Sequence, residues 1–158
     1  MKSDLEARLV SFNDLGISSG WKMSKQDPGL GDPCEGFWPR YYEVGAGIAF
    51  VKDSPAQVVA HHIVYYPNQG PQIFAEIRDR TLRCSDLSKN SSVRPIRVPV
   101  LGDEQVGVRI VTAVGNINQD IIYFRQGDLL SLVAVYNPDG SLNSVKIADA
   151  AAKYLSRR

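Results

Sequence analysis

The two cysteines are the residues best suited to covalent chemistry in this sequence. Cys34 and Cys84 lie 50 residues apart, and the chain has no third cysteine. We expect them to form one disulfide, which for a loop of about 50 residues stabilises the fold by roughly 4 kcal/mol in the chain-entropy model. Disulfides persist outside reducing compartments, so the pair favours an extracytoplasmic protein. A paired cysteine is also unavailable as a nucleophile.

Two adjacent histidines are the next candidates, His61 and His62. Neighbouring side chains on a strand point to opposite faces, so only one of the two can face a given site. The spacings typical of metal sites, such as Cys-x-x-Cys or His-Glu-x-x-His, are absent from the sequence. We therefore predict no metal site and no cofactor, with one histidine inside the sheet and the other at its surface.

Hydrolytic chemistry has weaker support. The sequence has no Gly-x-Ser-x-Gly elbow and no catalytic-cysteine signature. A triad can assemble from distant residues, so a secreted hydrolase using His62 and Asp103 stays open as an alternative. Asp103 and Glu104 form a tight acidic pair, but Leu101 and Gly102 before them indicate a turn entering a strand rather than paired catalytic carboxylates.

Aromatic side chains offer the best means of binding a ligand. The stretch 37–42 is amphipathic, lies in a predicted loop and follows Cys34 closely. Tyr and Trp often line grooves because they combine an apolar body with a polar tip, although ordinary core packing is the alternative. We predict a ligand-binding groove made by Trp38, Tyr41, Tyr42, Tyr65, His62, Tyr123 and Arg125.

Three helices are expected to position these residues. The first runs from a Ser3–Glu6 capping box to a left-handed cap at Gly16. The second begins near Pro71 and ends near Cys84. The third starts at Ser141 or Ser144 and continues to Leu155. The stripe expected to face the core from the second helix is Ile73, Phe74, Ile77, Thr81 and Leu82. Residues 17–40 are expected to be irregular.

Strands are predicted at 44–51, 58–66, 93–100, 104–114, 120–124 and 129–136. Gly45 and Gly47 indicate a strand that another segment approaches closely, and Pro95 and Pro99 indicate an edge strand or an extended arm. Residues 125–128 form a hairpin turn. Short turns between consecutive strands indicate antiparallel pairing. The sequence thus predicts an α+β fold, with a single central antiparallel sheet of about five to six strands and helices packed against it.

Length and charge narrow the function classes. The 158 residues fit a single domain spanning 1–158. The formal net charge is +1, and acidic residues interleave the densest group of arginines (Arg78, Arg80 and Arg83), so we expect no nucleic-acid partner. There is no apolar run of about 18 residues and no signal-peptide pattern. We expect that an export signal, and any membrane anchor, are absent from this sequence.

Several short motifs together resemble a known family. They are Asn13-Asp14-Leu15-Gly16 through Gly20-Trp21, the loop Cys34, a strand ending at Tyr65-Tyr66, a helix ending in 78–84, the segments 101–109 and 123–128, and an alanine-rich last helix. This order resembles the PknH-like extracellular sensor domain of actinobacterial lipoproteins and receptor kinases. The resemblance implies an exported domain with a central antiparallel sheet and a groove suited to a ligand. The kinase sensors have two disulfides, whereas this chain can make only one.

We therefore predict a non-enzymatic extracytoplasmic binding or sensor module, of lipoprotein or receptor type. Its partner would be an unidentified small-molecule, lipid or cell-envelope ligand. A protein–protein interaction module of PsbP-like architecture is the alternative, and a secreted hydrolase has less support. Contact with a membrane is expected only through an anchor that this sequence lacks.

Overall fold

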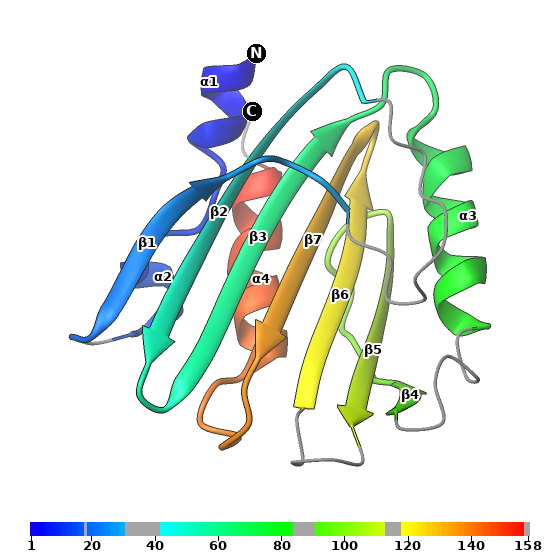
Figure 1. The fold of residues 1–158 in the computed structure, drawn as a ribbon. Helices are drawn as coiled ribbons and strands as arrows, with labels where there is room; N and C mark the ends of the chain where they lie inside the picture. Colours follow the sequence, from blue (N-terminus) through cyan, green and yellow to red (C-terminus); the bar gives the residue numbers. More distant parts are fainter. Residues whose placement is uncertain (18, 31–41, 84–90, 113–117, 157–158) are drawn as a thin grey trace.

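Seven antiparallel strands form one sheet in the computed structural model, in the order β1-β2-β3-β7-β6-β5-β4 (Figure 1). The structure describes residues 1–17, 19–30, 42–83, 91–112 and 118–156. The strands are β1 (Trp21–Gln26), β2 (Val44–Asp53), β3 (Ala56–Tyr65), β4 (Ser91–Pro95), β5 (Glu104–Thr112), β6 (Asn118–Gln126) and β7 (Leu129–Tyr136). The helices are α1 (Lys2–Glu6), α2 (Phe12–Leu15), α3 (Gly70–Leu82) and α4 (Ser144–Leu155). The predicted α+β class with a single antiparallel sheet is confirmed, and the sheet is larger than the expected five to six strands.

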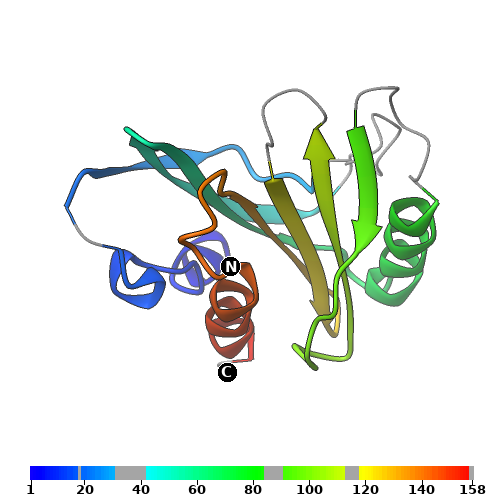
Figure 2. The ribbon, with the colours of Figure 1, turned by 90° about the horizontal axis from the view of Figure 1, so that it is seen from below.

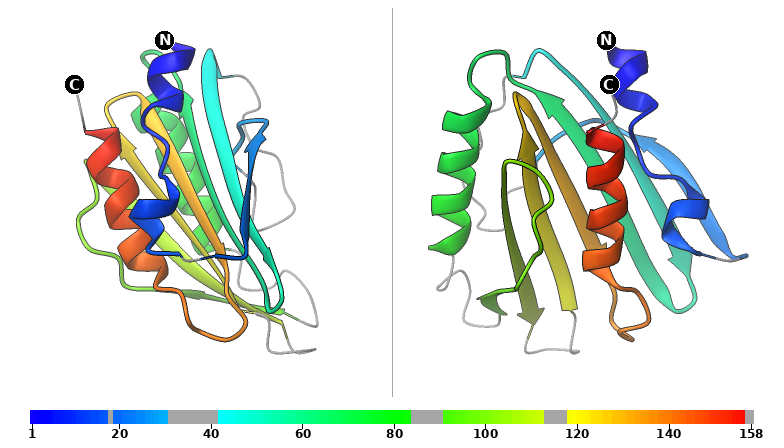
Figure 3. Two further views of the ribbon diagram at one scale, coloured as in Figure 1. Left: turned by 90° about the vertical axis from the view of Figure 1, so that its left-hand side faces the viewer. Right: turned by 180° about the vertical axis from the view of Figure 1, so that it is seen from behind.

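Each face of the sheet carries its own core. Along β6, Ile122 and Phe124 belong to one core and Ile121 and Tyr123 to the other, as strand alternation requires. The first core packs against α1, α2 and α4, and the second packs against α3. Figure 2 shows α1, α2 and α4 grouped beneath one half of the twisted sheet, with α3 beside the other half. Seen from behind in Figure 3, α4 crosses the central strands. We call these surfaces the α4 face and the α3 face.

The N-terminal segment differs from the single capped helix expected. It forms two short helices, and α1 begins after Met1 with no side-chain cap, so the Ser3–Glu6 capping box is wrong. The capping box lies in α2, where Ser11 and Asp14 bond each other's backbone amides. Gly16 ends α2 in the left-handed conformation with φ of 60°, as predicted. The break between the helices brings the backbone of Val10 against the sheet, where its N–H reaches His61.

Residues 17–40 are not wholly irregular, since they contain the edge strand β1. Trp21 pairs with Lys52 and Gln26 with Gly47 across the β1–β2 ladder. Five of the six side chains of β1 are exposed. A strand exposed on its edge lacks the apolar alternation by which half-buried strands are recognised, which is why the sequence pattern missed it. This extra strand accounts for the larger sheet.

The remaining elements follow the sequence pattern closely. The strand predicted over 58–66 is present as β3. The segment predicted over 93–100 is an edge strand only as far as Pro95, because β4 spans Ser91–Pro95 and residues 96–100 form no strand. A Cβ added to Gly45 would lie 2.7 Å from the Cβ of Pro28, which confirms the close approach to β2. In α3, Ile73, Phe74, Ile77 and Thr81 are buried as expected. Leu82 is the exception: it is 49% exposed, because it lies at the last turn and points away from the sheet. No described helix is long and apolar enough to cross a membrane.

Candidate functional site

His61 lies fully buried on the α4 face and fastens the N-terminal segment to the sheet. Its Nδ1 accepts a hydrogen bond from the Val10 backbone N–H at 3.2 Å. Its Nε2 lies 2.9 Å from the Ser131 Oγ. Burial, followed by the charge of neighbouring His62, lowers the pKa of His61 from 6.5 to about 3. The imidazole is therefore neutral at physiological pH.

The same two bonds decide whether His61 and Ser131 could act as a base–nucleophile pair. Because Nδ1 accepts from Val10, the proton of the neutral ring must be on Nε2. Nε2 then donates to the Ser131 hydroxyl and has no lone pair with which to take its proton. Ser131 is itself 1% exposed, so a substrate could not reach it. The pair is structural, and sequence reasoning did not single out Ser131.

His62 makes the corresponding contact on the α3 face. Its Nδ1 accepts a hydrogen bond from the Gly29 backbone N–H at 3.0 Å. The Tyr42 hydroxyl donates to the Pro28 carbonyl at 2.8 Å, so two side chains hold the Pro28–Gly29 segment over β2 and β3. Burial lowers the pKa of His62 as well. One histidine was expected inside the sheet and the other at its surface. His61 is buried as expected, whereas His62 is half-buried because the Pro28–Gly29 segment lies against it.

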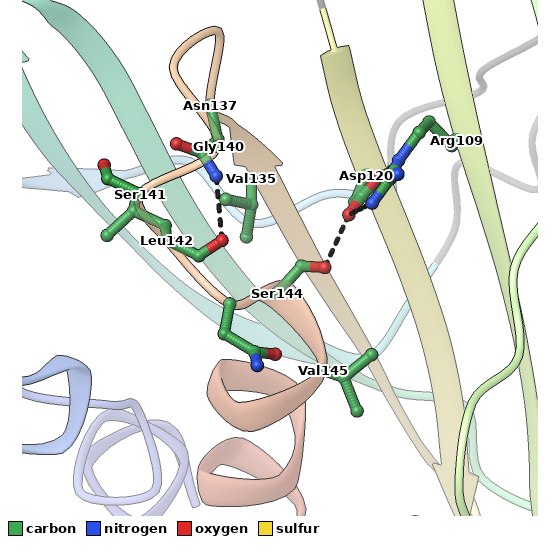
Figure 4. A pocket seen from close by; sticks show the side chains of 10 residues that line it. Arg109, Asp120, Val135, Asn137, Gly140, Ser141, Leu142, Ser144 and Val145 are labelled. Atoms are coloured by element: carbon green, nitrogen blue, oxygen red, sulfur yellow. Dashed lines mark hydrogen bonds and ion pairs between the residues drawn. The ribbon is translucent and has the colours of Figure 1, made fainter.

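A cavity of about 410 Å³ lies where α4 begins on the α4 face (Figure 4). Its side chains come from β5, β6, β7 and the segment that leads into α4. At its inner wall Arg109 donates two hydrogen bonds to Asp120, from Nε at 2.7 Å and Nη2 at 2.9 Å. The Ser144 hydroxyl donates to the same carboxylate at 2.6 Å. We call this the Asp120 cavity. Its lining combines carboxylate, hydroxyl, amide and guanidinium groups with the aliphatic side chains of Val135, Leu142 and Val145, so it suits a small molecule with both polar and apolar parts.

Asp120 is ionised in this setting. Burial alone would raise its pKa, but hydrogen bonds from Arg109 and Ser144, with the guanidinium charge, hold that pKa below its ordinary value of 3.8.

We expect Arg109→Gln to raise the pKa of Asp120, because it removes a charge and two hydrogen bonds while the burial remains. An NMR titration of the Asp120 carboxyl carbon measures this. Arg94→Gln, on the neighbouring strand opposite Arg109, is the matched control and should leave the titration unchanged. An unchanged Asp120 titration in Arg109→Gln would contradict the assignment.

The structure disperses the predicted groove residues. His62 and Tyr42 meet at the Pro28–Gly29 segment, whereas Tyr65 points to the α4 face, since it follows Val64 of the α3-face core. Tyr123 is 1% exposed beneath α3. Trp38 and Tyr41 lie outside the described residues, as do both cysteines.

Arg125, the remaining predicted groove residue, is held by carboxylates at one end of the sheet. It donates to Glu104 at 2.8 Å and to Asp103 at 3.1 Å. Asp103 also accepts the Gly127 N–H at 2.8 Å, which ties it to the β6–β7 turn. This confirms that Asp103 and Glu104 lie in a turn entering a strand. Among the described residues, no group of three or more histidine, cysteine, aspartate or glutamate side chains is placed to hold a metal ion.

Sequence reasoning did not identify the Asp120 cavity. Arg109 and Asp120 come from adjacent strands and face each other directly in the β5–β6 register. Opposite charges directly across an antiparallel ladder are a recognisable signal once the register is known. The sequence alone does not fix the register between β5 and β6, because that register depends on the connection between the two strands. Without it, Arg109 and Asp120 could not be paired.

The fold belongs to the α+β proteins with a single antiparallel sheet and helices on both faces. It is shared with a solved structure, the extracellular domain of PknH from Mycobacterium tuberculosis. The two superpose with a TM-score of 0.69 over 99% of this chain and 97% of that one, at 14% sequence identity. An uncharacterized protein from Mycobacterium smegmatis, the Rv0999 ortholog, superposes with a TM-score of 0.52 over 94% and 95% of the two chains, at 12% identity. No family model matches the sequence, and no curated protein matches it significantly. The PknH-like resemblance is thus confirmed at the level of the fold.

Proposed function

We propose that this chain is a non-enzymatic binding module of the sensor type that works outside the cytoplasm. The observation that carries the proposal is the fold shared with the extracellular domain of PknH over nearly the whole of both chains. The cysteine pair supports the same compartment, because disulfides persist in oxidising surroundings. A binding role fits the chemistry of the described polar groups. The two residues of the hydrolase alternative both have other partners: the Nδ1 of His62 accepts the Gly29 N–H, and Asp103 accepts hydrogen bonds from Arg125 and Gly127.

For the ligand groove we propose the surface around Trp38, Tyr41, Tyr42 and His62. Tyr42 and His62 support this choice because they lie together on the α3 face at the Pro28–Gly29 segment. We leave Tyr123 and Arg125 out of this surface, because Tyr123 is buried beneath α3 and Arg125 is paired with Glu104 and Asp103. Tyr65 points to the other face of the sheet.

Binding of soluble peptidoglycan fragments, measured by calorimetry, tests this groove. We expect saturable binding that Trp38→Ala or Tyr41→Ala weakens by about tenfold or more, because a stacked aromatic ring supplies roughly 1 kcal/mol beyond its buried area. Tyr65→Ala is the matched control and should bind as the parent protein does. Equal binding by Trp38→Ala, Tyr41→Ala and the parent would remove the proposed groove.

A protein–protein module of PsbP-like architecture would need a contiguous apolar or aromatic surface of about 800 Å². The large hydrophobic side chains that are most exposed among the described residues are Met1, Met23, Leu82 and Val100. They lie on four different segments, the residue before α1, β1, α3 and the stretch between β4 and β5. A binding module for a smaller ligand therefore has the better support.

A further inference from the structure

Two further cavities lie at the β1 edge of the sheet, away from the Asp120 cavity. One has a volume of about 230 Å³, is open to solvent on one side, and is lined mainly by apolar side chains, Leu9, Val10, Phe12, Met23 and Ile48, with Glu6, Ser11 and Lys25 beside them. The other, of about 340 Å³, is lined by charged side chains of α1 and of the segment after β1. The two cavities share Glu6, Lys25 and Gly47, so they adjoin. We call them the apolar and the polar cavity.

The inner walls of the apolar cavity are rigid. Phe12 packs edge-on against the fully buried ring of Phe50, with 4.9 Å between ring centroids. Val10 is 1% exposed and fixed to His61 through its backbone N–H. The outer wall is Met23, on the edge strand, which is 54% exposed. A thioether side chain at such a position adapts to what it covers. The cavity is therefore preformed, with one adaptable wall.

The apolar cavity is lined by side chains that favour an apolar ligand. An apolar cavity of about 150 Å³ stays dry and takes up a benzene-sized molecule. A cavity of about 230 Å³ lined by the same kinds of side chain has room for a short alkyl chain. Gly47, with no side chain, forms part of the boundary that both cavities share.

The polar cavity selects the head of the same ligand. Lys2 and Lys25 bring two ammonium groups, and Glu6 and Asp27 bring two carboxylates. These charges balance, so they complement a head that carries both charges, whereas a head with one charge can pair with only half of them. The barrier between the cavities is the Lys25–Glu6 ion pair at 3.4 Å, with side chains 82% and 38% exposed. An exposed pair of this kind contributes little to stability and can open to admit a ligand.

We propose that these adjoining cavities bind a single-chain amphiphile, with its alkyl chain between the N-terminal segment and β1–β2 and its zwitterionic head among Lys2, Glu6, Lys25 and Asp27. This site is formed by other residues than the aromatic groove proposed above, and the Pro28–Gly29 segment borders both. The residues that line it all belong to the described part of the chain: they lie in α1, α2, β1 and β2, in 9–11 between the two helices and in 27–28 after β1.

Calorimetry with n-octylphosphocholine, kept below its micelle concentration, tests the proposal on the full chain. Saturable binding is expected, and octanoate, with a net negative head, should bind at least about fivefold more weakly. Free phosphocholine should not bind, because the apolar chain supplies the transfer free energy. Absence of saturable binding by octylphosphocholine, or equal binding by octanoate, would overturn the proposal.

The site itself is tested by Met23→Asp, which places a charge in the wall of the apolar cavity. The side chain is exposed on an edge strand, so folding should survive. Octylphosphocholine binding should weaken by about tenfold or more. Ser24→Asp is the matched control: it adds the same charge to the next residue, which points to the other face, and should change binding by less than about twofold. Equal weakening in both variants would mean that charge alone, rather than the cavity, controls binding. Loss of octylphosphocholine binding with peptidoglycan binding intact would leave the aromatic groove standing.

Discussion

Acidification from pH 7 to pH 4.5 should lower the free energy of unfolding by about 2.5 kcal/mol through His61 alone. The unfolded chain binds a proton on this histidine at about pH 6.5, whereas burial lowers the pKa in the folded protein to about 3. Between these values the unfolded state binds more protons than the folded state. The stabilisation is therefore complete above pH 6.5 and is lost progressively as the pH falls. Urea unfolding at a series of pH values measures the slope.

The variant His61→Asn isolates this effect. Its side-chain oxygen can accept the Val10 N–H in place of Nδ1, but it cannot titrate. The variant should be less stable at pH 7 by about 2 kcal/mol, because the contact with Ser131 and some buried volume are lost. Its stability should also depend much less on pH between 6.5 and 4.5. His62→Asn, one residue away and half-buried on the other face, should keep most of the slope of the parent protein.

The folded parent protein offers a check that needs no variant. The ring NMR signals of His61 should show no titration between pH 7 and 4.5, since the neutral ring persists in the fold. A titration midpoint near 6.5 would contradict the structural assignment. So would equal pH dependence in His61→Asn and the parent.

His61 and His62 each hold a backbone segment that borders a proposed ligand surface. An imidazolium has no acceptor at Nδ1, so protonation is incompatible with the bond from Val10 and with the bond from Gly29. The first bond fixes the wall of the apolar cavity, and the second fixes the segment that borders the polar cavity and the aromatic groove. Both ligand surfaces that we propose therefore depend on neutral histidines in the same strand.

The elements with strong periodicity were predictable from the sequence, and those without it were not. The apolar runs of β2 and β3 and the stripe of α3 reflect burial, which forces a regular pattern on the residue types. The strand β1 escaped detection because five of its six residues face solvent at the edge of the sheet. The split of the first helix escaped for a different reason. It depends on a tertiary contact, the bond between Val10 and His61, which joins residues 51 apart in the sequence.

The site residues show the same division between local and long-range information. Strand alternation alone predicted that His61 and His62 would face opposite ways, and it also implies that His62 and Tyr65 cannot share one face. It could not reveal the partners of either histidine, nor the pairing of Arg109 with Asp120, which requires the β5–β6 register. Residue type was a poor guide to exposure for Tyr123, whose ring is covered by α3.

The disulfide between Cys34 and Cys84 should contribute the other large effect, roughly 2–4 kcal/mol of stability in the oxidised protein. It would close a loop of about 50 residues, and the chain-entropy model assigns its benefit to the restricted unfolded state. Intact mass after alkylation in denaturant measures the pairing: without reductant no alkyl group should add, and after reduction two should add.

Cys34→Ser, Cys84→Ser and the double variant should lose the same stability, because removing either partner removes the whole bond. If both cysteines alkylate at once in oxidised material, the bond is absent. The extracytoplasmic proposal then loses its chemical support and rests on the fold alone.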